Sequence, residues 1–594
     1  MSGSEVQLLN SPYGEATYEL FRKLRRAFAD KSGMIGVLDD IGTTRYPVLL
    51  RPRRFGKSTF VQMLKCFYDL SYKDRYEELF SGTDIYQKHL PSHNTYHVLD
   101  LDFSGVSGLD LGTLIESFIV AIRSGITNFR RRYRDFVFAP RPEEEKMPSS
   151  YIKSFINAYS DYSPTQSLYV MIDEYDNFAS SLLHCNLELF KTVTGAGGFV
   201  KDFYAAIKDG AKTCVYKTFI TGVSSVSLDS LTSGFNISLN VTSDAGFNEY
   251  AGFTEAELKK MIPQLVDLRK IGATAEEVIS MMKPVYDGYC FSTEASGTVY
   301  NSSMCLYYLT RMRKLGRLLA PEKCLDPASD HDGSNLRLLF DLAEKDLADE
   351  IIDTYLAGNT FRVDALADKI NLNKSSKYDR IKLLSMLYYL GYLTIDPDFS
   401  DDSAVILKIP NLYVSKVFAQ CTVDRRLLPS CLFNEQTLDV SSLLAFQDDL
   451  SSFASSCTAF LSTIFTNQVL SHMSEMALNL VLHAKLNSLS GVNSVPALMA
   501  EMQKSLRVAG EGEMYADLVI TVDNGIGNKC IYLIELKYSS KSEASEASLE
   551  RLKKKAVQQV LLYQSALEFR GKQVKSYAMV FAGSECVHCV RAGS

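Results

Sequence analysis

The residues around Lys57 have the types and spacing of a phosphate-binding loop. The apolar segment YPVLL (46–50) runs into RPRRFGKST, whose Gly56-Lys57-Ser58 opens a stretch of helical periodicity. Amide groups at a helix start bind phosphate oxygens, the lysine reaches the terminal phosphates, and the serine hydroxyl binds Mg²⁺. We therefore expect a nucleotide site made by Arg54, Phe55, Gly56, Lys57, Ser58 and Thr59, with Ser58 also a metal ligand. The strict signature has glycine where this chain has Arg51, so the loop alone also fits a structural turn.

An acidic pair at the end of a second apolar segment supports the nucleotide interpretation. The segment LYVMI (168–172) is followed by Asp173 and Glu174. At a strand end, Asp173 can hold Mg²⁺ and Glu174 can polarise the water that attacks a phosphate. The alternative is a surface acidic cluster. Both halves occur in the expected order, so we predict that the protein binds ATP with Mg²⁺ and hydrolyses it.

A third group of residues, toward the C-terminus, fits metal-dependent cleavage of phosphodiesters. Asp517 precedes the apolar run LVITV, and Glu535 and Lys537 are two apart in IYLIELKY, so both face one side of a strand. Carboxylates of adjacent strands can share a divalent metal, and the lysine can orient or activate the attacking water. The pattern is short and also arises by chance. Further candidates are the metal ligand Glu475, the catalytic Gln559 and its neighbour Tyr563.

Two basic clusters each allow two interpretations. Arg551 to Lys555 (RLKKK) lies just before Gln559, and it fits either a solvated helix face or a nucleic-acid contact. FRRRYR (129–134) interleaves basic and aromatic residues, and for it we favour a solvated helix end. Cys586-Val-His588-Cys589 contains half of a zinc ligand set, but no second half follows, so we expect a structural role.

The motifs fall in three regions with different periodicities. From 46 to about 225, apolar runs alternate with helical stretches, which predicts a parallel sheet covered by helices on both faces. The stretch 364–410 reads as three helices and a hairpin, typical of a winged helix. We expect an α/β protein divided as follows: a nucleotide-binding domain over 1–255, a helical and winged-helix region over 256–420, a linker over 421–440 and an α/β domain over 441–594.

Composition excludes several classes of protein. The 594 residues are 46% hydrophobic and 22% charged, which is typical of globular proteins and neither disordered nor fibrous. No secretory signal or membrane-spanning run is readable, and the cysteines are scattered, so we expect an intracellular protein, cytoplasmic or nuclear. The net charge is −7, but residues 501–594 carry 13 basic and 11 acidic residues, so acidity does not exclude nucleic acid as a partner.

Taken together, these motifs resemble the AAA-ATPase-like family that carries a C-terminal nuclease of the PD-(D/E)XK superfamily. The resemblance rests on RPRRFGKS, LDFS, IDEYD, FYAAIKD, ITGVSSVS, GFTEAEL, YDGYCF, LLSMLYYLGYLTI and the ADLVI…YLIELKY pair. Members commonly depart from the strict phosphate-loop signature at Arg51. A similar pairing of ATPase and nuclease occurs in Crinkler-type secreted effectors and in retrotransposon hot spot proteins, although no effector-like leader is readable here.

The resemblance implies a P-loop fold followed by a restriction-endonuclease-like domain. It makes Lys57, Ser58, Asp173 and Glu174 the nucleotide and Mg²⁺ residues, and it makes Asp517, Glu535 and Lys537 the nuclease core. Gln559 and Tyr563 match a helical QxxxY element, and Glu475 matches an upstream acid. Members often carry Gly-Arg before the metal-binding aspartate, whereas Met514-Tyr515-Ala516 precede Asp517.

The function expected from the sequence is an ATP-hydrolysing protein coupled to a Mg²⁺-dependent nuclease, with DNA as its partner. RNA is a third possibility that the sequence does not separate from DNA. The rival is a nucleotide-dependent switch that binds nucleic acid or protein without cleaving it. By analogy with the ATPase class, assembly into a homo-oligomer is also open.

Overall fold

The computed structural model divides the chain into two compact units. One comprises Met1–Asp330, Leu342–Glu344 and Phe361–Leu412, and the other comprises His331–Asp341, Lys345–Thr360 and Tyr413–Ser594. The structure describes these residues: 8–40, 45–163, 167–195, 197–226, 234–321, 324–329, 332–368, 370, 378–401, 403–431, 438–490, 498–508, 512–523 and 529–593. No helix of this part of the chain is long and apolar enough to cross a membrane.

The N-terminal unit is built on a five-stranded parallel sheet. Its strands are β1 (Pro47–Leu50), β2 (Tyr96–Asp102), β3 (Ser167–Asp173), β4 (Val215–Gly222) and β5 (Leu239–Asn240). Their order is β2-β3-β4-β1-β5, and each neighbouring pair is parallel. Because the strands are parallel, the phosphate-loop strand β1 and the acidic strand β3 end at the same edge of the sheet. β4 lies between them. The predicted parallel sheet is confirmed, and β5 is an addition.

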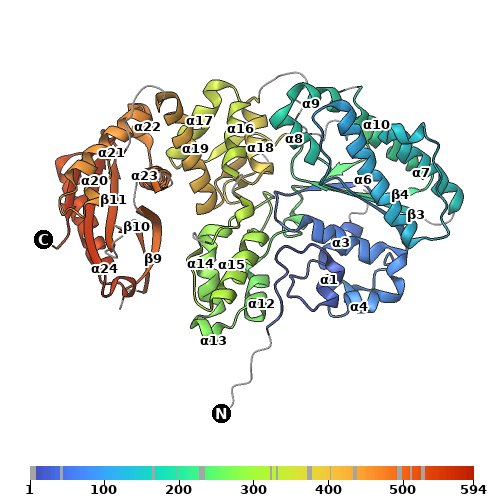
Figure 1. Cartoon of the computed structure of the whole chain (residues 1–594), viewed down its shortest axis with the longest axis horizontal. Coiled ribbons are helices and arrows are strands. Elements are labelled where there is room, and N and C mark those ends of the chain that lie inside the picture. The colour runs from blue at the N-terminus through green and yellow to red at the C-terminus, as the bar shows by residue number, and fades with distance from the viewer. Residues whose placement is uncertain are drawn as a thin grey trace, which may run out of the picture. The chain divides into compact units, whose positions relative to one another are not determined.

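Helices cover both faces of this sheet, as predicted. Figure 1 shows α3 (Lys57–Tyr68) on one side of the strands, and on the other side α6 (Leu111–Arg132), α7 (Pro148–Tyr162) and α10 (Phe199–Gly210). α6 packs closely on β2 at Gly125, where a side chain would not fit: a Cβ there would lie 2.6 Å from the Asp100 carbonyl oxygen. The expectation of a solvated end for α6 is wrong at Arg132, whose guanidinium pairs with Asp69 at 3.0 Å and Asp100 at 2.8 Å.

The rest of this unit is mostly helical. Two of its helices begin with capping boxes, in which Thr254 pairs with Glu257 and Thr274 with Glu277. The helices not yet given are α1 (Tyr18–Lys23), α2 (Gly33–Asp40), α4 (Tyr76–Phe80), α5 (Asp84–Lys88), α8 (Asn177–Cys185), α9 (Leu187–Thr194), α12 (Glu255–Leu265), α13 (Leu268–Ile271), α14 (Ala275–Tyr286) and α15 (Ser302–Leu315).

The winged-helix interpretation of 364–410 is confirmed only in its hairpin. β7 (Thr394–Ile395) and β8 (Val405–Lys408) are antiparallel, and β6 (Phe361–Val363) pairs with the other edge of β8. The three helices predicted in this stretch are wrong for its described residues, which form one helix, α18 (Arg380–Tyr389). α18 is buried over most of its circumference, so its apolar residues do not follow a one-faced helical period.

The C-terminal unit contains a second, different sheet. Its order is β13-β12-β11-β10-β9, antiparallel throughout except for the parallel pair β11–β12, which α24 (Glu546–Gln564) connects. The ADLVI and YLIELKY segments, expected to be adjacent strands, form the antiparallel pair β10–β11. The strands are β9 (Leu498–Val508), β10 (Gly512–Asp523), β11 (Lys529–Ser539), β12 (Gln573–Ala582) and β13 (Glu585–Arg591).

Helices precede and flank this second sheet. They are α16 (Asp332–Asp341), α17 (Lys345–Leu356), α19 (Leu412–Cys431), α20 (Ser441–Leu444), α21 (Ser451–Ile464), α22 (Asn467–His472) and α23 (Glu475–Ser490). α19 occupies 421–431 of the range expected to be a linker, and 432–437 lie outside the described residues. The domain boundaries drawn from the sequence stay a prediction.

Candidate functional site

The phosphate loop joins β1 to α3 through two residues in the left-handed backbone region. Arg54 has φ +69° and Gly56 has φ +92°, a conformation that glycine adopts without cost and arginine does not. The Arg54 carbonyl accepts hydrogen bonds from the Ser302 hydroxyl at 3.0 Å and from the Ser303 amide at 3.2 Å. The start of α15 therefore holds the loop in this shape.

Arg51 explains why the strict loop signature fails in this chain. Its side chain is fully buried, and its guanidinium donates to the carbonyl oxygens of Leu50 at 2.7 Å, Thr242 at 2.9 Å and Phe247 at 2.7 Å. The guanidinium also lies over the Phe291 ring, 4.1 Å from its centroid. Burial lowers the pKa of Arg51. Arg51 thus joins the start of the loop to the segment that follows β5, and its role is structural.

The residues predicted to bind nucleotide and metal meet at the ends of β1 and β3. Lys57 is buried, and its ammonium lies 3.4 Å from the Glu174 carboxylate and donates to the Pro52 carbonyl at 3.3 Å. The Ser58 hydroxyl is hydrogen-bonded to the Asp173 carboxylate. Burial raises the pKa of Asp173 to about 6; the Ser58 hydrogen bond opposes this shift and the Glu174 charge adds to it.

Glu174 itself is held in an unusual backbone conformation, with φ +53°. A non-glycine residue with this φ carries strain of about 1 kcal/mol or more, and such strain is common at functional sites. Its amide donates to the Asp173 carboxylate at 2.9 Å, and the following Tyr175 amide donates to the Thr221 carbonyl at 3.1 Å. The turn therefore orients the two acidic side chains independently, one toward Ser58 and the other toward Lys57.

Polar residues at the ends of β3 and β4 form hydrogen bonds inside the protein. Asp176 is fully buried and accepts hydrogen bonds from the Val223 amide at 3.0 Å and from the Ser224 amide and hydroxyl at 2.7 and 2.8 Å. The Thr221 hydroxyl donates to the Leu49 carbonyl at 2.6 Å. The IDEYD and TGVSS motifs are thus tied together through Asp176, a role that the sequence analysis did not assign.

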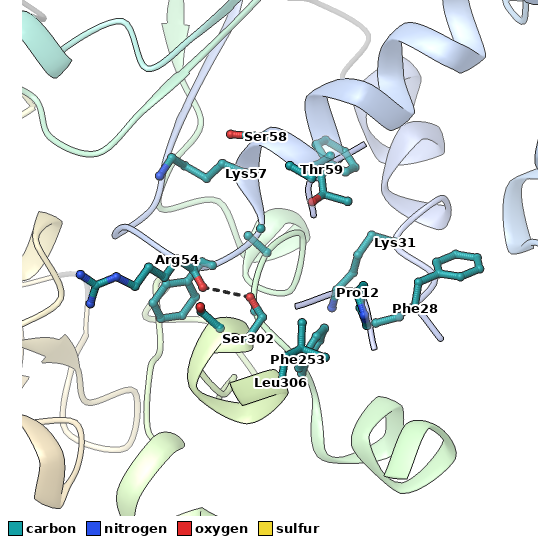
Figure 2. Close-up of a pocket in the computed structure, with 18 of the residues that line it drawn as sticks. Pro12, Phe28, Lys31, Arg54, Lys57, Ser58, Thr59, Phe253, Ser302 and Leu306 are labelled. Carbon is teal, nitrogen blue, oxygen red and sulfur yellow. Dashed lines mark hydrogen bonds between the residues drawn. The ribbon is translucent and has the colours of Figure 1, made fainter. Parts of the chain in front are cut away.

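A pocket of about 290 Å³ adjoins the phosphate loop within this unit. Its lining includes all six predicted loop residues (Arg54, Phe55, Gly56, Lys57, Ser58 and Thr59) together with Glu174. Figure 2 shows the Lys57 side chain at one end, and at the other the apolar side chains of Phe28, Phe253 and Leu306. A cation and helix amides at one end and apolar walls at the other suit a ligand with a phosphate tail and a ring system.

In the C-terminal unit, Lys537 lies at the centre of three carboxylates. Its ammonium is 2.8 Å from Glu535, 3.0 Å from Glu475 and 3.8 Å from Asp517. Glu535 and Lys537 are two apart on β11, Asp517 is on β10, and Glu475 begins α23. The structure thus brings together four of the six residues that the sequence singled out for this site, although these four span 63 positions of the chain from Glu475 to Lys537.

The carboxylates of Asp517 and Glu535 are buried beside each other. Burial raises the pKa of Glu535 well above its usual range, and the neighbouring Asp517 charge adds to the shift. Burial likewise raises the pKa of Asp517. The Glu535 Oε2 atom is buried without a hydrogen-bond partner among the described residues. Two crowded carboxylates with an unpartnered oxygen are a donor set that suits a divalent cation.

Asp517 is oriented by a residue that the sequence analysis missed. The Gln503 side-chain amide donates to Asp517 Oδ1 at 3.0 Å, and the Leu536 amide donates to Asp517 Oδ2 at 3.0 Å. Gln503 is on β9 and has φ +48°, in the left-handed region. The alternation of apolar residues in β9 is interrupted beside Gln503, because Lys504 stands between Met502 and Leu506 where the pattern calls for an apolar residue. That interruption is a signal of irregular backbone, but it does not indicate the contact with Asp517.

Gln559 and Tyr563 lie beside this site on α24. The Gln559 amide is 3.5 Å from the Tyr563 hydroxyl, and the Gln559 Oε1 atom is buried without a partner among the described residues. Tyr563 packs with Leu533, two residues before Glu535 on the same face of β11. Burial, and then the Glu535 and Asp517 charges, raise the pKa of Tyr563 to about 12. The predicted QxxxY residues therefore border the carboxylate pair.

No group of three or more His, Cys, Asp and Glu side chains in the described ranges is arranged to hold a metal ion. At the C-terminal site Glu475 and Glu535 both pair with Lys537, Asp517 accepts two hydrogen bonds, and the Glu535 Oε2 atom has no hydrogen-bond partner among the described residues. Mg²⁺ is commonly bound by only one or two carboxylates with water and substrate phosphate. Cys586 and Cys589 lie in β13 and belong to no such group either.

Comparison with known protein families gives one match to the N-terminal unit. Residues 12–232 match the model of a family described as AAA-ATPase_like, a predicted AAA-ATPase. The match suggests nucleotide-hydrolysing activity and covers the phosphate loop, the acidic strand and the end of β4. It does not reach the C-terminal unit, so the nuclease domain and the similarity to Crinkler-type effectors stay predictions. No curated protein matches the chain.

Proposed function

We propose that the N-terminal unit binds ATP with Mg²⁺ and hydrolyses it. The observation that carries this proposal is that two pairs of residues, Lys57 with Glu174 and Ser58 with Asp173, meet beside the pocket at the ends of β1 and β3. The family match over residues 12–232 supports it.

The chain's own residues divide the work of ATP binding between the two ends of the pocket. The apolar walls of Phe28, Phe253 and Leu306 accept the base, and the amides of the first turn of α3 point at the phosphates. Lys57 exchanges its contact with Glu174 for the terminal phosphates. Glu174 is then free to accept a proton from the attacking water.

Ser58 and Asp173 would hold Mg²⁺ at this site. The Ser58 hydroxyl in the first turn of α3 and the Asp173 carboxylate at the end of β3 supply oxygen atoms, the ligands that Mg²⁺ requires. The bound ion supplies charge neutralisation at the β- and γ-phosphate oxygens. The raised pKa of Asp173 fits the same role, because a buried carboxylate next to Glu174 gains from a nearby cation.

Nucleotide binding is tested by replacing Lys57 with Ala in the full-length chain. We expect the affinity for ATP, measured by titration calorimetry with Mg²⁺, to fall at least tenfold, because the lysine contact to the phosphates is lost. The matched control is Arg53→Ala, an exposed cation four residues earlier in the same loop. Equal loss in both variants, or none in Lys57→Ala, would contradict the proposed site.

For the C-terminal unit we propose a Mg²⁺-dependent nuclease that cleaves DNA. The convergence of Asp517, Glu535, Lys537 and Glu475 supports it. Asp517 and Glu535 would hold the metal ion, which supplies Lewis-acid activation when bound. Lys537, fixed by Glu475, stabilises negative charge that develops at the phosphodiester.

The alternative is a nucleotide-dependent switch that binds nucleic acid or protein without cleaving it. The two proposals separate in a cleavage assay with single- and double-stranded DNA and RNA, with and without ATP, in Mg²⁺. A nuclease loses cleavage in Asp517→Asn and in Lys537→Met, while both variants still bind the nucleic acid. If the wild-type protein retains nucleic acid and cuts none of these substrates, the switch is supported and the nuclease proposal fails.

A further inference from the structure

One row of side chains on α24 runs from solvent to the carboxylate site. Residues four apart on a helix form a continuous ridge, and on α24 this ridge comprises Arg551, Lys555, Gln559 and Tyr563. Burial increases along it. Arg551 and Lys555 are exposed, Gln559 is half-buried, and Tyr563 is buried next to Glu535 and Asp517.

The outer half of this ridge is positively charged, and the neighbouring Lys554 adds a third charge. Arg551, Lys554 and Lys555 have no ion-pair partner among the described residues, whereas Lys553, on the other side of the helix, pairs with Glu550 at 3.4 Å. The same three cations line a shallow hollow of about 530 Å³ with Gln558 and Glu550, and the Glu550 carboxylate pairs with Lys553. Three cations and an amide against one paired carboxylate leave the hollow net positive, which suits an anionic ligand.

The inner face of α24 keeps this row in a fixed position. Ala556, Val560 and Tyr563 are buried, and Val560 and Tyr563 pack in one cluster with Ile531 and Leu533 of β11. The residues after Leu533 on the same face of β11 are Glu535 and Lys537. The helix is therefore packed on the strand that carries the candidate catalytic groups.

We propose that the ridge Arg551–Lys555–Gln559–Tyr563 is a track for the phosphate backbone of a nucleic acid that leads into the Asp517–Glu535–Lys537 site. Arg551 and Lys555 are about 6 Å apart along the helix axis, and their long side chains carry the two charges to separate phosphates of one strand. Each cation contacts one phosphate, and Gln559 offers its amide to the strand nearest the carboxylates. The role of the track in cleavage rests on the proposed nuclease, whereas its binding of nucleic acid does not.

The track is tested by removing two charges from it and, separately, two from elsewhere in the same unit. The track variant is Arg551→Gln/Lys555→Gln, and the matched control is Arg570→Gln/Lys572→Gln, an exposed pair outside α24. Each variant replaces one arginine and one lysine, so the two have the same net charge. Binding of a 30-nucleotide single strand, its duplex and the RNA of the same sequence is measured in EDTA, where metal-dependent cleavage is off.

We expect the track variant to bind about tenfold more weakly than the control near 0.1 M salt. Its plot of log affinity against log salt should be less steep by about 0.7 per lost contact on a single strand and 0.9 on a duplex. Equal weakening in both variants would show a bulk charge effect and overturn the track. So would an absence of nucleic-acid binding by the wild type, or binding only to vesicles that contain 30% phosphatidylserine.

Cleavage is measured separately in Mg²⁺ on the same substrates. If the wild type cuts nothing but the track variant still binds selectively more weakly, the nuclease proposal fails and the track stands. If the wild type cuts and the track variant binds and cuts as the control does, the nuclease stands and the track is overturned. Circular dichroism of both variants confirms that α24 is intact, since glutamine keeps a helix propensity close to that of lysine and arginine.

Discussion

Gln503 of β9 and Asp517 of β10 lie opposite each other. At this point the alternation of side chains between the two faces of the sheet shifts by one residue in both strands. Leu518 pairs with Met502 on one side and Ala516 with Lys504 on the other. Paired residues share a face, and Ala516 and Val519 belong to the same core cluster although they are three apart. The left-handed Gln503 (φ +48°) accompanies this change of face, and its amide contacts Asp517 at 3.0 Å.

The first prediction separates the two contributions of Gln503. Gln503→Ala removes the amide and keeps a strained backbone, whereas Gln503→Gly removes both. We expect the glycine variant to be about 1 kcal/mol more stable than the alanine variant by urea unfolding. Both should bind Mn²⁺ at the Asp517 site about tenfold or more weakly than the wild type, because Asp517 loses an orienting partner. Unchanged Mn²⁺ affinity in both would show that Gln503 does not position Asp517.

The second prediction concerns the buried arginine of the phosphate loop. Arg51→Met leaves the Leu50, Thr242 and Phe247 carbonyls without their shared donor. We expect a loss of stability on the order of 3 kcal/mol and weaker ATP binding. The control is Arg53→Met, which removes an exposed arginine of the same loop. Thermal unfolding followed by calorimetry checks this. If the two variants unfold at the same temperature, Arg51 does not hold the loop.

The third prediction is a pH dependence of the C-terminal unit. Burial lowers the pKa of His483 to about 4, with the Lys416 charge acting in the same direction. An unfolded histidine has a pKa of about 6.5. Between that pH and about 4, His483 is therefore protonated in the unfolded state and neutral in the folded state, which favours unfolding. Stability is therefore complete above pH 6.5 and falls by about 3 kcal/mol as the pH drops toward 4.

Urea unfolding at pH 7.5 and pH 4.5 tests this shift. His483→Gln should lose less stability between the two pH values than the wild type, since glutamine does not titrate. His472→Gln, at an exposed position of the same unit, should behave as the wild type does. If His483→Gln and the wild type lose the same amount, another group causes the pH dependence.

Much of the N-terminal fold could be predicted because its signals are local. YPVLL, HVLDLDF, LYVMI and VYKTFITGV are short apolar runs between helical stretches, and each is a strand of the parallel sheet. The loop residues around Lys57 and the acidic pair could be placed at strand ends for the same reason. The strand order could not, since pairing of β4 between β1 and β3 depends on contacts between distant segments.

Other features have no local signal. Lys504 interrupts the alternation of apolar residues in β9, but the interruption shows neither the left-handed backbone of Gln503 nor its contact with Asp517. Arg132 belongs to a basic run, and only the fold brings it to Asp69 and Asp100. The helices expected around 364–390 illustrate the reverse error. Of the described residues there, only Arg380–Tyr389 form a helix, and α18 is buried over most of its circumference, so its apolar residues give no one-faced period that would mark where a helix begins or ends.

The most direct test of the central claim is to compare ATP turnover and ATP affinity in the wild type and in Glu174→Gln. Lys57 is 3.4 Å from Glu174, and we assign Lys57 to the phosphates and Glu174 to the attacking water. We expect Glu174→Gln to bind Mg²⁺–ATP at least as tightly as the wild type while phosphate release falls about 100-fold or more. Turnover in Glu174→Gln equal to that of the wild type, or no ATP bound by either protein, would contradict this assignment.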